Sequence, residues 1–185
     1  MTMKATAAKP IQGGAVSIGP LSASLPTDAT SSATGFSQLG YISEDGVTRT
    51  REIDNDVVKA WGGDVVLVLE MGQTEKFKFT LIEPANVNVL KLVNGDDAVT
   101  GSDISTGIAV TSNARAKGGH KFIIDMLEAE DTWHRICVPN GVLSSLGDTT
   151  YVDNGAVGYE VEITAIADSS GNTAYEYIKT GSTGS

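Results

Sequence analysis

The sequence predicts a mainly β fold: an antiparallel β-sandwich or barrel with one flanking α-helix, an extended N-terminal arm and a long loop. Three observations support this prediction. Most apolar segments have the length of strands, and several alternate apolar with polar side chains, which is the period of a half-buried strand. Only one segment has the start and stop signals of a helix. The 21 glycines among 185 residues supply the turns that many short strands require.

The first 35 residues are predicted to form a flexible N-terminal arm. They are rich in Ala, Ser, Thr, Gly and Pro, so they bury too little apolar surface to offset the entropy of ordering the backbone. Larger apolar side chains that a solvent-exposed tail would not need are scattered through the segment, which indicates ordering on a neighbour: Ile11, Val16, Ile18, Leu21 and Leu25. The domain itself is predicted over residues 36–180, and a flexible C-terminal tail over 181–185.

The long loop is predicted at about residues 43–64, after a strand over 36–42. This stretch is too polar for the core and too long for a simple turn, and connections of that kind are usually functional or disordered. It is either an extended, poorly buried hairpin or a mobile loop. The next segment, DVVLVLEM at 64–71, is apolar enough to predict a strand buried on both faces.

The remaining elements follow in order. A turn is predicted at Gly72–Gln73, followed by a strand over 74–83 with its Phe and Leu side chains on one face. The segment 83–95 predicts the helix, because a proline suits its first turn and Asn94–Gly95 its end. Further strands are predicted over 106–111, 121–130, 132–139, 158–168 and 174–180.

Composition excludes several classes of function. The net charge of −10 argues against coating DNA, which needs clustered Lys and Arg; solubility alone also explains this charge. The single cysteine, Cys137, allows no intramolecular disulfide and is predicted to be a buried thiol. No segment has the apolar length of a signal peptide or of a membrane span. We therefore expect a protein kept in a cytoplasm-like compartment, or exported without a signal.

Motifs for chemistry are absent from the sequence. It contains no nucleophile elbow, phosphate-binding loop or dinucleotide fingerprint. His120 and His134 lack further ligands at metal-site spacing. The carboxylates around 125–131 are typical of a solvated turn. We predict no catalytic residues, no cofactor and no metal, and hence no enzyme.

Three segments, in this order, resemble a known family: LGYISEDGV, KAWGGDVV and FKFTLIEPANVNVLKLVNGDDAVT. Between about Phe36 and Ile166 the chain resembles the major tail protein, or tail tube protein, of long-tailed bacteriophages. The resemblance implies a structural virion protein that forms hexameric rings, stacked into a hollow tube that conducts DNA without binding it specifically. It also implies assembly in the host cytoplasm, other tail proteins such as the tape measure and the tail terminator as partners, and no membrane.

The resemblance also implies a role for the long loop, which would reach the adjacent ring or subunit. Its candidate contact residues are Arg49, Arg51, Asp54, Asp56, Lys59 and Trp61. Trp61 is either an interface anchor, since tryptophan is favoured at hot spots, or a loop side chain folded back on its own domain.

The alternation in GYEVEIT predicts that Glu160 and Glu162 point away from the core. Such carboxylates would face either the lumen of a tube or its outer surface. In the lumen they would repel phosphate groups, over a distance limited by screening to about 8–10 Å.

Two other classes of protein compete with a self-assembling tail protein. One is a monomeric β-sandwich adhesin or carbohydrate-binding module on a virion or cell surface, which would present an exposed aromatic platform. The other is a small enzyme, which would need a cleft with paired titratable groups. Few aromatic residues and long flanking arms favour the tail protein.

Overall fold

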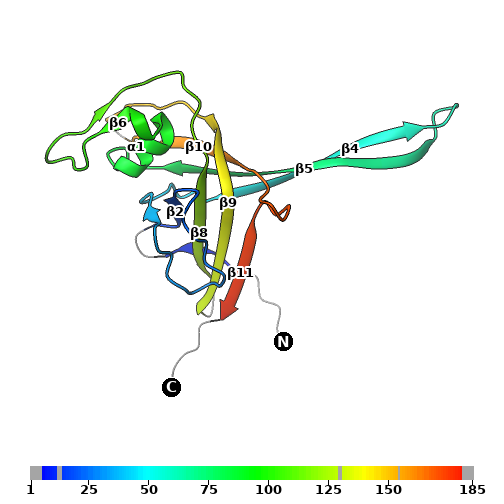
Figure 1. Ribbon diagram of the computed structural model, residues 1–185, viewed down its shortest axis with the longest axis horizontal. Helices are drawn as coiled ribbons and strands as arrows, with labels where there is room; N and C mark the ends of the chain where they lie inside the picture. The colour runs from blue at the N-terminus through cyan, green and yellow to red at the C-terminus, as the bar shows by residue number, and fades with distance from the viewer. Residues whose placement is uncertain (1–5, 12–13, 129–130, 154, 181–185) are drawn as a thin grey trace.

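The computed structural model describes residues 6–11, 14–128, 131–153 and 155–180. The protein is mainly β, with 46% strand and 7% helix, so the predicted fold class is confirmed. The predicted C-terminal tail, 181–185, and the first five residues of the predicted N-terminal arm lie outside the described residues. Figure 1 shows a body of crossing strands with one helix at its end, and a long two-stranded hairpin that leaves the body.

The body contains most of the secondary structure. Its strands near the N-terminus are β1 (Lys9–Pro10), β2 (Val16–Gly19) and β3 (Ser37–Gln38). The hairpin strands are β4 (Thr48–Lys59) and β5 (Val65–Leu81). Then come the helix α1 (Val87–Asn94), a 3-10 turn (Asp96–Ala98), β6 (Val99–Thr100) and β7 (Ala109–Val110). The last strands are β8 (His120–Glu128), β9 (Thr132–Leu146), β10 (Tyr159–Ala165) and β11 (Tyr175–Thr180).

One antiparallel sheet of nine strands, in the order β3-β2-β8-β9-β10-β5-β4, forms most of the fold; β1 also pairs with β8, and β11 with β9. The long strand β9 joins the two halves of this sheet. Its first part pairs with β8 and β11, and its last part pairs with β10. Side chains from both halves meet in a single core, which is a sandwich rather than a closed barrel.

The core depends on the alternation in the second half of β5. Phe77, Phe79 and Leu81 are almost completely buried, which confirms the predicted inward face of this strand. Val89 and Leu92 of α1 pack into the same cluster. The helix lies within its predicted segment but begins only at Val87, so Pro84 precedes it and, contrary to the prediction, does not belong to its first turn. Asn86 caps the helix instead, by accepting a hydrogen bond from the Asn88 backbone N–H at 3.0 Å.

The segment after Gly14 belongs to the sheet, although its composition predicted a flexible arm. Val16 is completely buried, and β2 pairs with β8 from Val16–Ile124 to Gly19–Lys121. Gly14 has a φ of +125°, and a Cβ there would lie 2.3 Å from the carbonyl oxygen of Gly40. Composition did not predict this packing, because the stabilising contacts of β2 come from a strand more than a hundred residues away.

Val16→Ala is therefore expected to lower the free energy of unfolding by about 1–3 kcal/mol, the scale for burying a valine side chain. Val66→Ala is the matched control, since Val66 is largely exposed. Urea unfolding followed by tryptophan fluorescence measures both. Equal effects of the two substitutions would contradict the placement of β2 in the core.

Several elements differ from the prediction, and one open alternative is decided. Residues 64–71 are not buried on both faces, and Gly72–Gln73 form no turn, because β5 runs unbroken through them. The predicted loop at 43–64 contains β4. Of the two alternatives, an extended hairpin or a mobile loop, it is the hairpin. Strand β9 continues past residue 139, and the predicted strand at 106–111 contains only β7.

Candidate assembly interface

A long hairpin arm, residues 53–73 of β4 and β5, projects from the body (Figure 1). Its turn is closed by two backbone hydrogen bonds, from Ala60 N–H to the Asp64 oxygen at 2.8 Å and from Gly63 N–H to the Ala60 oxygen at 3.0 Å. Gly62 and Gly63 have positive φ values of 122° and 98°, which glycine adopts without strain. The turn therefore presents Trp61, which is fully exposed, at the tip of the arm.

Both faces of this arm are apolar. Val57 pairs with Val68 on one face, and Val58 pairs with Leu67 on the other, because side chains alternate along each strand. Apart from the fully exposed Trp61, the larger apolar residues of the arm, from Ile53 to Met71, are each 41–69% exposed. A two-stranded ribbon is marginally stable in water, and apolar patches of this extent usually mark an interaction site. The arm is therefore a candidate interface on both of its faces.

A cluster of ion pairs holds the base of the arm against the body. Glu75 of β5, which is almost completely buried, accepts hydrogen bonds from Arg49 and Arg51 of β4 and from Thr173. Arg49 also bonds to Glu176 of β11 at 2.8 Å, and its guanidinium lies 5.5 Å from the centre of the buried Phe77 ring. The cluster links both strands of the arm to the C-terminal strand.

His134 of β9 extends this cluster. Its Nδ1 lies 2.7 Å from Glu128 Oε1, and its Nε2 lies 2.6 Å from Glu176 Oε1. The histidine therefore joins the end of β8 to β11. His120, the other histidine, lies at the start of β8 and pairs with Asp96, so the two rings belong to separate sites.

The carboxylates of the cluster are held in their ionised forms. Burial opposes ionisation of Glu75, but the bonds from Thr173, Arg49 and Arg51 outweigh it and lower its pKa. The hydrogen bond from Arg49 is the main cause of the lowered pKa of Glu176. Both pKa values lie below the ordinary value of 4.5 in the folded protein. The cluster thus stabilises the fold above about pH 4.5, and this contribution is lost as pH falls through the lowered pKa values.

Glu75→Gln is expected to reduce stability at pH 7 and to make the decline between pH 5 and pH 3 shallower than in the wild type. The physical reason is that the variant has no carboxylate to protonate at the centre of the cluster. Glu44→Gln is the matched control, since Glu44 is an exposed carboxylate outside the cluster. Urea midpoints at pH 7, 5 and 3 test this. A loss of stability between pH 5 and pH 3 as steep in the Glu75→Gln variant as in the wild type would contradict this prediction.

The structure divides the predicted contact residues into two groups. Asp54, Asp56, Lys59 and Trp61 lie on the arm and are exposed. Arg49 and Arg51 lie in the cluster at its base instead, each bonded to Glu75. Contact with another molecule stays a prediction for all six.

Glu160 and Glu162 lie on the outer face of β10 and alternate with the buried Val161 and Ile163, as the sequence predicted. This face is less acidic than expected. Glu160 forms an ion pair with Lys78 of the adjacent strand, with 3.0 Å between Oε1 and Nζ. That Glu160 and Glu162 face the lumen of a tube stays a prediction.

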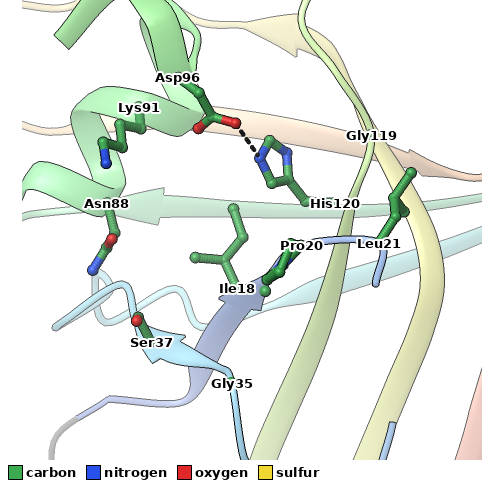
Figure 2. A pocket seen from close by; sticks show the side chains of 11 residues that line it. Ile18, Pro20, Leu21, Gly35, Ser37, Asn88, Lys91, Asp96, Gly119 and His120 are labelled. Atoms are coloured by element: carbon green, nitrogen blue, oxygen red, sulfur yellow. Dashed lines mark ion pairs between the residues drawn. The ribbon is translucent and has the colours of Figure 1, made fainter. Parts of the chain in front are cut away.

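A pocket that the sequence analysis missed lies between α1 and the start of the chain (Figure 2). It has a volume of about 490 Å³. Its apolar lining comes from Ile18, Pro20 and Leu21, and its polar lining includes Lys91 of α1 and His120. No sequence motif could have indicated it, because its lining residues come from four segments that only the fold brings together.

The chemistry of this pocket does not match a known catalytic arrangement. His120 Nε2 lies 3.4 Å from Asp96 Oδ2. Ser37 and Lys91 also line the pocket, but within the described residues neither side chain is hydrogen-bonded to His120. No group of three or more His, Cys, Asp and Glu among the described residues is placed to hold a metal ion. Cys137 is buried, as predicted, and burial raises its pKa to about 12. Each helix in the described ranges is too short or too polar to span a bilayer.

The chain was also compared with known proteins. A family model described as phage tail tube protein matches residues 2–183, nearly the whole chain. No curated protein matches it significantly. The family match confirms the resemblance that the order of the three sequence segments indicated.

Proposed function

The chain belongs to the phage tail tube protein family, and from this premise we propose that its copies form hexameric rings that stack into the hollow tube of a phage tail and conduct DNA into the host. The family is structural, so the protein is a component of the virion tail with a non-enzymatic role. Assembly takes place in the host cytoplasm. The partners are further copies of the chain and other tail proteins, such as the tape measure and the tail terminator.

The observation that supports this proposal most directly is the arm with two apolar faces. Its apolar side chains are exposed in the single chain, and another copy of the protein would bury them. An arm that binds a different surface on the next copy makes a heterologous contact, and contacts of this type close into rings or repeat along a tube. Within the arm, Asp54, Asp56, Lys59 and Trp61 make the contacts between subunits or rings, and Arg49 and Arg51 support them from its base.

The lumen is proposed to be lined by the outer face of β10. Glu160 and Glu162 point away from the core there, and the chain as a whole carries a net charge of −10. Lys78 neutralises Glu160 in part, so Glu162 is the stronger source of repulsion toward phosphate groups. DNA passing this surface would be repelled rather than bound.

A monomeric adhesin or carbohydrate-binding module is not favoured by any observation. Such a module needs aromatic side chains side by side on one surface. The exposed aromatic residues Tyr41, Trp61 and Tyr151 belong to three different segments of the chain.

Negative-stain electron microscopy and sedimentation velocity of the concentrated protein test the proposal. Rings and tubes with sixfold symmetry are the expected result. Single particles of monomer mass at all concentrations would contradict it.

A further inference from the structure

We propose, as an extension of the proposed function, that the arm tip of one copy docks in the pocket beside α1 of another copy, with Trp61 as the inserted side chain. We call this site the α1 pocket. The lining residues expected to contact the tryptophan are Ile18, Pro20, Leu21, Lys91 and His120. The occupant is a second copy of this chain.

A chain cannot fill its own α1 pocket with its own arm tip. The tip and α1 lie at opposite ends of the long axis of the molecule in Figure 1. The ribbon between them is held by antiparallel backbone pairing from Thr48–Lys78 to Lys59–Val65, interrupted by register shifts after Asp54 and Val58. Folding the tip back to the helix would break this pairing. An exposed tryptophan and a pocket of suitable size on the same molecule therefore point to contact between copies.

The shape and polarity of the α1 pocket suit an indole ring. Its volume of about 490 Å³ lies within the range of roughly 300–1,000 Å³ that is usual for sites that enclose organic groups. Ile18 and Pro20 supply apolar walls, and Leu21 is 48% exposed, so it has surface left to bury. Tryptophan is enriched among residues that dominate binding energy in such pockets.

Charge also favours this pairing. The arm, residues 53–73, carries four carboxylates and one lysine. Lys91 lines the α1 pocket, and Arg115 and Lys117 line the hollow next to it, which shares Asp96 with the pocket. With Asp97, the two linings hold three cations against two carboxylates, which leaves a positive balance. No ion pair with a carboxylate occupies these three cations within the described ranges. A cation beside an indole face adds a further attraction.

His120 gives the wall of the α1 pocket an unsatisfied polar atom. Its Nδ1 atom is buried and has no hydrogen-bond partner among the described residues. Unsatisfied buried polar atoms are rare in native structures and call for an explanation. A surface that a partner completes is one such explanation, and it agrees with the position of His120 between Asp96 and the apolar wall (Figure 2).

Disulfide trapping tests the contact directly. The variant Ala60→Cys, next to the tryptophan, is mixed with Leu21→Cys under assembly conditions and oxidised. The expected result is a cross-linked dimer that forms only in assembled material. The control pairs Ala60→Cys with Ser170→Cys, in the turn before β11, and should form at least tenfold less dimer. Cys137 is present in every variant and is buried.

A double-mutant cycle measures the energy of the same contact. Trp61→Ala and Lys91→Ala are each expected to raise the critical concentration for assembly, by roughly tenfold or more for the tryptophan. The double variant should raise it by clearly less than the product of the two effects, because both remove one contact. Thermal melting of the dilute monomers should stay within a few degrees of the wild type, since both side chains lie outside the core.

The two proposals fail in different ways. The docking site would be wrong if tubes form but the Ala60→Cys/Leu21→Cys cross-link does not. It would also be wrong if the effects of Trp61→Ala and Lys91→Ala on assembly are independent. Either result would leave the proposed tube standing. Failure of the wild-type protein to assemble at any concentration would contradict the docking site and the proposed function together.

Discussion

Replacing residues 54–72 with the dipeptide Asn-Gly is expected to yield a folded monomer that no longer forms tubes. Ile53 and Gln73 are paired across the hairpin, so a two-residue turn can close the strands at that point. No residue between 54 and 72 is in the buried core, so the body should keep its stability. Assembly should weaken by at least about a hundredfold, because the truncation removes Trp61 and both apolar faces together.

Circular dichroism melting measures whether the body keeps its stability, and sedimentation velocity measures whether assembly is weakened. Ile104→Ser is the matched control, because Ile104 is an exposed apolar residue outside the arm. The control shows whether general loss of surface hydrophobicity is sufficient to prevent assembly. Normal tubes from the truncated chain would refute the assignment of the arm as the interface.

The arm also shows why the sequence predicted correctly that a segment is a strand but wrongly that this strand is buried. The run Val65–Leu69 is apolar in the way that strands buried on both faces usually are, and it does form a strand. The body of the same chain does not cover this strand, whose side chains stay exposed. An apolar pattern does not say whether the surface that would cover the segment belongs to the same chain or, as proposed above, to a second copy.

Long-range pairing explains the other differences. Composition predicted disorder for the first 35 residues, yet β2 lies in the sheet, because β8 supplies its partner. The ion-pair cluster around Glu75 joins residues from three strands, and no spacing along the chain indicates it. Two strictly local signals were reliable, because the alternation around Phe77 and the helix ending at Gly95 are both observed. The local turn signal at Gly72–Gln73 was wrong, because β5 runs through it.

The N-terminal segment is held on the body by a buried ion pair. Arg135 of β9 and Asp125 of β8 are each at least 94% buried and bond through two nitrogen–oxygen contacts, at 2.5 Å and 3.1 Å. The guanidinium also donates to the backbone oxygens of Asp28 and Ser31, at 3.2 Å and 2.7 Å. One side chain therefore neutralises a buried carboxylate and fixes a segment that has little apolar surface of its own.

Arg135→Met is expected to lower the free energy of unfolding by about 3–5 kcal/mol, because it leaves the Asp125 carboxylate buried without a partner. The double variant Arg135→Met/Asp125→Leu should recover much of this loss, since it removes the buried charge. Recovery should be incomplete, because the carbonyl groups of Asp28 and Ser31 still lack their donor. Urea unfolding gives the three stabilities. Proteolysis in the segment 20–35 should increase in both variants, and equal protection in the wild type and the double variant would contradict a role for Arg135 in holding that segment.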